Sequence, residues 1–170
     1  MLTAGEYVLY GGVGVCRITD FEEKSVESVD GTKTHEYCRL VPVFASNSVY
    51  YIPSAILESK VRGLLSKSQV MSIINNMPST NSLKINDMKS KKSIFGSILR
   101  SGDYSQIVPM IKLLHDEKLQ RMSNGKKLTF SDEKAMQDAE ELLCQEFSMV
   151  LNIDKNDVPQ YIENTLHSAV

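Results

Sequence analysis

Nucleophilic and basic side chains are the first candidates for chemistry in this 170-residue chain. A Cys or Ser nucleophile needs a His within hydrogen-bond reach, and His35 and Cys38 lie nearest to this pattern. Both fall in one predicted strand, where positions three apart face opposite ways. His115 lies at a charged helix end and His167 near the C-terminus, where solvated imidazoles are expected. We therefore predict that the chain is not an enzyme and has no catalytic residues.

Metal and cofactor sites are equally unsupported by the residue pattern. The cysteines Cys16, Cys38 and Cys144 are odd in number and lack CxxC spacing, so neither a disulfide framework nor a zinc site is predicted. The run "GGVG" is too short to be a phosphate-binding loop and lies within a strand pair. We expect no metal and no cofactor.

Charge is the property that points to a partner. The net charge is −2, but residues 1–80, 81–130 and 131–170 have net charges of −1, +6 and −7. A block of positive charge inside an acidic chain indicates a localised anionic partner. A solvated helix face is the alternative explanation for such a lysine-rich stretch.

The elements that would position these side chains begin with short strands. Segments rich in β-branched and aromatic residues predict strands at residues 7–10, 13–18, 35–43 and 49–53. Gly11 and Gly12 suit a tight turn between the first two, and Gly14 is the predicted bend in the second. Such a sheet is predicted to close on itself as a small barrel, with glycines or bulges at its corners.

Helical spacing replaces the strand pattern from about residue 53. Apolar stripes predict helices at residues 66–77, 87–100, after Asp103, from about 130 to 147, and after residue 156. Ser66, Asp103 and Thr129 are the predicted N-caps, and Gly102 is a predicted left-handed C-cap. Pro109 is expected to kink the helix that contains it or to delay its start.

These patterns predict an α+β protein of two domains. The polar run "PSTNS" at residues 78–82 is the predicted linker. The expected division is a barrel domain at residues 1–65, a helix and linker at 66–80, and a helical domain at 81–170. No apolar run is long enough for a membrane span and no signal segment is evident, so we expect a cytoplasmic protein that is not bound to a membrane.

The order of motifs resembles the CarD/CdnL family of bacterial RNA-polymerase-binding transcription regulators. In the first half the resemblance rests on "GEYVLYGGVGV", "EYCRLVP" and "VYYIP". Gly11 and Val13 depart from it, because the family usually has Pro and His there. In the second half it rests on "RSGDYSQIV" and on "LTFSDEKAMQDAEELLCQEFS". The related transcription-repair coupling factor is excluded, because the chain is too short for a helicase.

The resemblance implies that a Tudor-like N-terminal barrel binds the RNA polymerase β subunit. An exposed barrel edge can accept a partner strand through main-chain hydrogen bonds. The family's contact strand corresponds to Val49, Tyr50, Tyr51 and Ile52. Tyr50 and Tyr51 are expected to point to opposite faces, with one of them in the core.

The resemblance also implies that the helical domain binds promoter DNA at the upstream edge of the open bubble. Relatives place a tryptophan wedge there, but this chain has no tryptophan and the matching position is Met88. Met88 is either such a wedge or a core residue. The predicted phosphate contacts are Lys84, Lys89, Lys91, Lys92, Arg100 and Lys134, with further cations at Lys118, Arg121, Lys126 and Lys127. These contacts would be largely independent of DNA sequence.

Two functions from different classes therefore remain open. The first is a transcription regulator that binds polymerase and promoter DNA and modulates the stability of the open complex. It would act as a monomer associated with the nucleoid through polymerase. The second is a Tudor-like protein-protein adaptor that does not bind DNA, which the acidic residues 131–170 and the missing tryptophan would fit.

Overall fold

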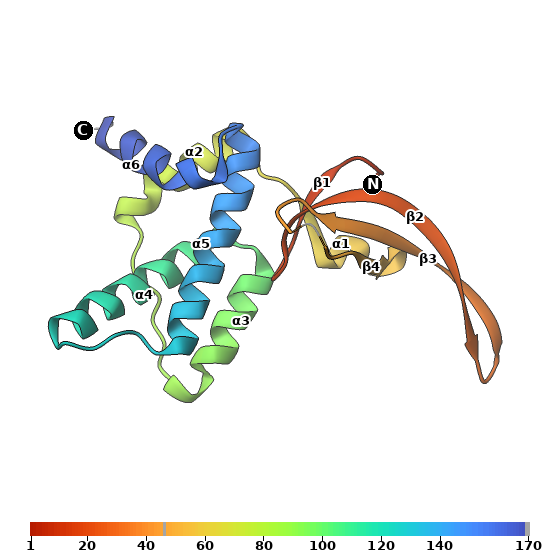
Figure 1. The fold of residues 1–170 in the computed structure, drawn as a ribbon, viewed down its shortest axis with the longest axis horizontal. Helices are drawn as coiled ribbons and strands as arrows, with labels where there is room; N and C mark the ends of the chain where they lie inside the picture. Colours follow the sequence, from red (N-terminus) through yellow and green to blue (C-terminus); the bar gives the residue numbers. More distant parts are fainter. Residues whose placement is uncertain (46, 169–170) are drawn as a thin grey trace. The chain divides into compact units, whose positions relative to one another are not determined.

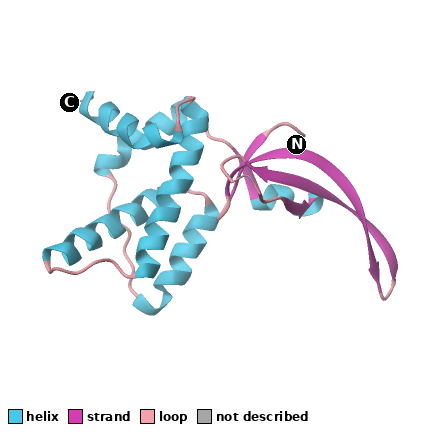
Figure 2. Ribbon diagram, viewed as in Figure 1, coloured by secondary structure: helices cyan, strands magenta, loops and turns pink. Residues whose placement is uncertain are grey.

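The computed structural model describes residues 1–45 and 47–168, and its backbone forms two compact units. Unit 1 is Met1–Leu64 and unit 2 is Leu65–Val170. Figures 1 and 2 show that the strands belong to unit 1 and that unit 2 is built from helices. The chain is therefore an α+β protein, as predicted.

Unit 1 is built on one antiparallel sheet with the strand order β4-β3-β2-β1-β5. The strands are β1 (Tyr7–Tyr10), β2 (Gly14–Ser28), β3 (Gly31–Pro42), β4 (Tyr50–Pro53) and β5 (Val61–Gly63). The four predicted strands are confirmed, although β2 and β3 are longer than predicted. The sequence pattern does not predict β5, which has only three residues.

Glycines form the turn between β1 and β2. The Val13 N–H donates to the Tyr10 carbonyl at 3.0 Å, and Gly12 and Gly14 have φ angles of 84° and 120°. Such positive values favour residues without a Cβ atom. Gly14 is the first residue of β2, and a separate irregularity lies further along this strand, where the register with β3 shifts between residues 18 and 20.

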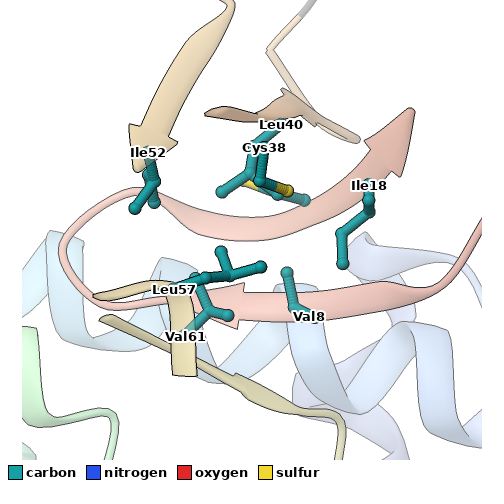
Figure 3. Packing of buried hydrophobic residues seen from close by; sticks show 8 residues of the cluster. Val8, Ile18, Cys38, Leu40, Ile52, Leu57 and Val61 are labelled. Atoms are coloured by element: carbon teal, nitrogen blue, oxygen red, sulfur yellow. The ribbon is translucent and has the colours of Figure 1, made fainter. Parts of the chain in front are cut away.

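The core of unit 1 lies on one face of this sheet and includes two of the cysteines. Figure 3 shows Val8, Ile18, Cys38, Leu40 and Ile52 gathered in this cluster with Leu57 and Val61. Cys16 belongs to the same cluster. Burial raises the pKa of the Cys16 thiol to about 12, and it also raises the pKa of Cys38. Both thiols thus stay protonated and act as small apolar side chains.

The sheet is not a closed barrel, which corrects the sequence-based prediction. Its edge strands β4 and β5 do not pair with each other in the described residues. Between them the chain forms η1 (Ser54–Ile56) and α1 (Leu57–Lys60), and Leu57 is buried in the core. A short helical segment therefore covers apolar side chains where a closed barrel would continue its ladder. Among the described residues, no strand other than β3 pairs with β4, so its outer edge is open.

Strands β2 and β3 continue beyond the core as a two-stranded arm, here residues 22–36. In the described chain, residues 23–28 and 31–36 pair only with each other, from Glu23 opposite Glu36 to Ser28 opposite Gly31, and Glu22 pairs with Tyr37 at the base of the arm. Most of their side chains are exposed. Figure 1 shows the two long strands curving away from the rest of the sheet. No strand is predicted over residues 19–34, because this segment lacks the apolar alternation of a half-buried strand.

Unit 2 is a helical bundle with one long central helix. Its elements are α2 (Lys67–Asn76), η2 (Met77–Ser79), η3 (Met88–Ser90), α3 (Lys91–Ser101), α4 (Tyr104–Ser123), α5 (Phe130–Leu151), η4 (Lys155–Asp157) and α6 (Val158–Ser168). Helix α5 packs against α2, α3, α4 and α6, as Figure 1 illustrates. Its fully buried residues include Ala139 and Phe147.

The predicted helix caps are observed. Ser66 and Gln69 form a capping box at α2, and the Asp103 and Thr129 side chains accept backbone N–H groups at α4 and α5. Gly102 ends α3 with a φ of 64°. The start of α4 is not delayed, because this helix begins at Tyr104 and contains Pro109.

A buried carboxylate fixes the beginning of unit 2. Glu146 on α5 accepts hydrogen bonds from the Leu65 backbone N–H at 2.9 Å and from the Tyr104 hydroxyl at 2.8 Å. Residues 66–80, which the sequence analysis set between the two domains, lie in unit 2, and α2 packs against α5 and α6.

Candidate interaction surfaces

The edge strand β4 presents alternate side chains to the core and to solvent. Tyr50 packs against the core cluster and meets Tyr10 edge to face, with ring centroids 5.6 Å apart. Ile52 is only 4% exposed, so its side chain is not available to a partner. Val49, just before the strand, and Tyr51 within it are exposed. Side-chain recognition at this edge is thus limited to Val49 and Tyr51.

A cation lies on the exposed tyrosine of this strand. The Lys24 ammonium, from β2, is 3.3 Å from the centroid of the Tyr51 ring. A lysine in this position is attracted by the electron-rich ring face. Lys24 is not among the predicted site residues, because it lies in the arm, far from β4 along the chain, and no local sequence pattern connects it to Tyr51. The edge therefore combines an aromatic ring and a positive charge.

Met88 lies on the surface of unit 2, so its interpretation as a core residue is wrong. It is the first residue of η3 and is 65% exposed. The side chain of Asp87 caps this turn by accepting the N–H of Lys89 and the hydroxyl of Ser90. The turn thus holds an exposed thioether immediately before α3.

Four of the predicted phosphate contacts are exposed cations. Lys84, Lys89, Lys92 and Arg100 lie on the surface, and in the described part of the chain none of them forms an ion pair. The Arg100 guanidinium lies close to Gly96, one turn earlier in α3. A Cβ atom added to Gly96 would lie only 3.1 Å from Arg100 Nη1. These four side chains can neutralise anions without first breaking a protein salt bridge.

Lys91, in contrast, forms ion pairs with two carboxylates of the protein itself. Its ammonium lies 2.8 Å from carboxylate oxygens of both Glu117 on α4 and Asp132 on α5, and its side chain is largely buried. Burial by itself would lower the pKa of Lys91, but the hydrogen bonds and charges of these two carboxylates raise it overall. Lys91 therefore joins α3, α4 and α5.

Lys134 is exposed but is also paired within its own helix. Its ammonium donates to Asp138, one turn further along α5. Surface pairs of this kind contribute little to stability and exchange readily with other partners. Lys134 can therefore contact an anion only in competition with Asp138.

The structure brings Lys92 and Lys134 together at a groove between α3 and α5. This groove has a volume of 270 Å³, and its walls are formed by Phe95, Leu99, Ala135 and Phe130 together with the two lysines and Asp138. Phe130, the first residue of α5, is 88% exposed. The sequence alone does not single out Phe130, because its exposure depends on how the start of α5 packs.

The structure does not bring together the histidine and cysteine that lie nearest to a nucleophile–base pattern in the sequence. His35 is exposed on the arm, whereas Cys38 points into the core. Cys144 is partly buried, and this burial together with nearby carboxylates raises its pKa to about 11. His115 pairs with Glu140 at 2.8 Å. Residues 1–45 and 47–168 contain no cluster of three or more potential metal ligands, and none of their helices is long and apolar enough to cross a membrane.

Comparison with protein-family models gives a match for each of the two units. Residues 2–65 match the family model of the CarD-like/TRCF RID domain, and residues 69–163 match that of the CarD C-terminal domain. The two matches cover nearly the whole chain and meet close to the division between unit 1 and unit 2. A search of curated proteins finds no match.

Proposed function

Because the chain belongs to the CarD/CdnL family of RNA-polymerase-interacting transcription regulators, we propose that it binds the polymerase β subunit with unit 1 and promoter DNA with unit 2. In this proposal the chain contacts DNA at the upstream edge of the transcription bubble and changes the lifetime of the open complex. Two sites in one chain raise the effective concentration of the second contact once the first has formed.

The open edge of β4 supports the proposed polymerase contact. A strand of the β subunit would add to this edge through main-chain hydrogen bonds, and exposed side chains would supply specificity. Val49 and Tyr51 are the side chains offered, with Lys24 on the Tyr51 ring. Tyr50 and Ile52 would contribute only main-chain groups, because their side chains pack in unit 1.

The single observation that favours a DNA contact is the exposed Met88 among cations that are not ion-paired. Methionine is one of the apolar side chains that proteins insert at base steps to unstack them. Lys84, Lys89, Lys92 and Arg100 would neutralise phosphates on either side of such a contact. Because phosphate contacts do not distinguish bases, promoter choice would come from the polymerase.

Two of the predicted DNA-contacting lysines form ion pairs within the protein, which favours the second candidate. This candidate is a protein-protein adaptor with the same fold that does not bind DNA. Lys91 is held by Glu117 and Asp132, and Lys134 by Asp138, so fewer cations are available than the sequence predicts. The adaptor would bind polymerase without changing the open complex. Binding to a promoter fragment in the absence of polymerase distinguishes the two candidates.

The lifetime of the open complex on a promoter fragment, with purified bacterial RNA polymerase, is the decisive measurement. We expect the full chain to change this lifetime, and we expect the variants Tyr51→Glu and Met88→Ala each to reduce the change. Polymerase binding measured in parallel should fall for Tyr51→Glu alone. Polymerase binding by the unsubstituted chain without any change in lifetime would establish the adaptor instead.

A further inference from the structure

Phe130 is the most exposed aromatic side chain in the described part of the molecule, at 88%. Single exposed apolar residues are common on protein surfaces. Phe130 differs from these because it forms one wall of the groove between α3 and α5. An aromatic ring at the mouth of an apolar groove offers a flat face to a planar ligand.

The rest of the groove combines apolar walls with positive charge. Phe95, Gly96 and Leu99 from α3 and Ala135 from α5 line it. Lys92 and Lys134 stand at the same groove, and Asp138 is its only acidic wall residue among those described. Lys126 and Lys127 are exposed in the loop that leads into Phe130.

This combination matches the chemistry of a single-stranded nucleic acid. Proteins that bind unpaired strands stack bases on aromatic side chains and track the backbone with lysine and arginine. Every base has a stacking face, so a ring such as that of Phe130 needs no particular sequence. A purely apolar protein partner would leave Lys92, which forms no ion pair in the described residues, without a counterpart.

The groove lies at the same end of unit 2 as Met88. The ion pair between Lys91 and Asp132, at 2.8 Å, joins the start of α3 to the start of α5. Met88 lies three residues before Lys91, and Phe130 lies two residues before Asp132. Met88 and Phe130 therefore each lie within three residues of a partner in this ion pair, in a chain that has no tryptophan.

We propose that Phe130 stacks on an unpaired base at the edge of opened DNA, while Lys92 and Lys134 contact the adjoining phosphates. This inference rests on the proposed function, because it requires unit 2 to bind DNA. It adds a second contact beside Met88, specific for single-stranded rather than double-stranded DNA.

Binding of the full chain to two labelled DNA molecules tests the inference. One is a duplex, and the other is a fork of the same sequence whose terminal bases are unpaired and include 2-aminopurine. We expect tighter binding to the fork and a change in 2-aminopurine fluorescence. Phe130→Ala should weaken fork binding by at least about fivefold, because each stacked base contributes this much or more. Duplex binding should change less than about twofold.

Three further variants separate stacking from other roles. Phe130→Trp should keep the fork preference because indole stacks, whereas Phe130→Leu should lose it because leucine has bulk without a ring face. Met122→Ala is the matched control, since Met122 on α4 is also an exposed apolar side chain outside the groove. It should bind both DNA molecules like the unsubstituted chain.

The remaining outcomes overturn the inference in distinguishable ways. Equal fork binding by the unsubstituted chain and Phe130→Ala, with duplex binding intact, rejects the stacking role and leaves the proposed function standing. Absence of binding to either DNA rejects both. Loss of polymerase binding by Phe130→Ala with unchanged DNA binding would assign the groove to a protein partner.

Discussion

The Lys24 ammonium lies 3.3 Å from the centroid of the Tyr51 ring, so the arm of unit 1 contributes directly to the open edge of β4. Cation–π pairs at exposed sites contribute about 0.5–1 kcal/mol. The pair holds the tyrosine side chain beside the strand edge before any partner arrives. Preordering of this kind lowers the entropic cost of binding.

Tyr51→Glu should weaken polymerase binding by about tenfold or more, because it replaces an aromatic contact at the proposed interface. Tyr7→Glu is the matched control. Tyr7 and Tyr51 are both 42% exposed, but β1 lies between β2 and β5 and has no open edge. Binding to immobilised polymerase measures both variants, and equal losses would argue against an interface at β4.

Met88→Ala should shorten the lifetime of open complexes formed with the full chain and leave polymerase binding unchanged. The physical reason is loss of an apolar side chain that would lie against an unstacked base step. Met122→Ala, which removes a thioether of similar exposure (59% against 65%), should behave like the unsubstituted chain. A stopped-flow or filter-binding decay assay gives the lifetime. The DNA role of Met88 is rejected if both methionine variants decay alike.

The dependence of DNA affinity on salt should reflect the four cations that are not ion-paired. With three or four phosphates neutralised, a plot of log affinity against log salt concentration should have a slope of about −3 to −4. Lys92→Ala should reduce the magnitude of this slope by about 1, whereas Lys134→Ala should reduce it less because Asp138 already holds that lysine. A slope near zero would mean that unit 2 does not contact phosphates.

Lys91→Met should destabilise unit 2 by about 2 kcal/mol, since it leaves Glu117 and Asp132 without their shared cation. The pKa of Lys91 is raised above its ordinary value of 10.5, so the stabilisation is complete below pH 10.5 and is lost as pH rises through the higher folded-state value. Urea unfolding at increasing alkaline pH should therefore show the two proteins converging. A constant difference at all pH values would contradict this origin.

Glu146→Ala should destabilise unit 2 by about 3 kcal/mol, because the Tyr104 hydroxyl and the Leu65 N–H lose a buried acceptor. Helical circular dichroism during urea unfolding reports on unit 2, which contains the long helices. Glu163→Ala, an exposed change on α6, is the control and should shift the unfolding midpoint little. Equal midpoints for the two variants would show that the buried hydrogen bonds do not stabilise the unit.

Local chemistry made the helix boundaries and the strand positions predictable. Ser66, Gly102, Asp103 and Thr129 are short-range signals, because each acts on backbone groups within a few residues of itself. The same logic does not predict the partner of Asp132. Its backbone N–H bonds Thr129 as expected, but its carboxylate bonds Lys91, which is distant in sequence.

The surfaces were less predictable, because they depend on which distant side chains meet. Lys91 and Lys92 are adjacent lysines in a basic run, yet Lys91 is largely buried between carboxylates and Lys92 faces solvent. Helical periodicity separates neighbours by about 100°, but only the packing of α4 and α5 decides which one is enclosed. Sheet closure was mispredicted for a similar reason, since Leu57 lies in a helical segment between two strands.

The composition of the arm bears on how copies of this chain behave at high concentration. The two strands in residues 22–36 each have an outer edge that pairs with no further strand in the described chain, and such edges are templates for edge-to-edge aggregation. They contain five acidic and two basic residues, and Glu23 stands directly opposite Glu36. Two arms that approached each other would bring like charges together at close range. We therefore expect the excess of acidic residues to oppose edge-to-edge association of two such hairpins.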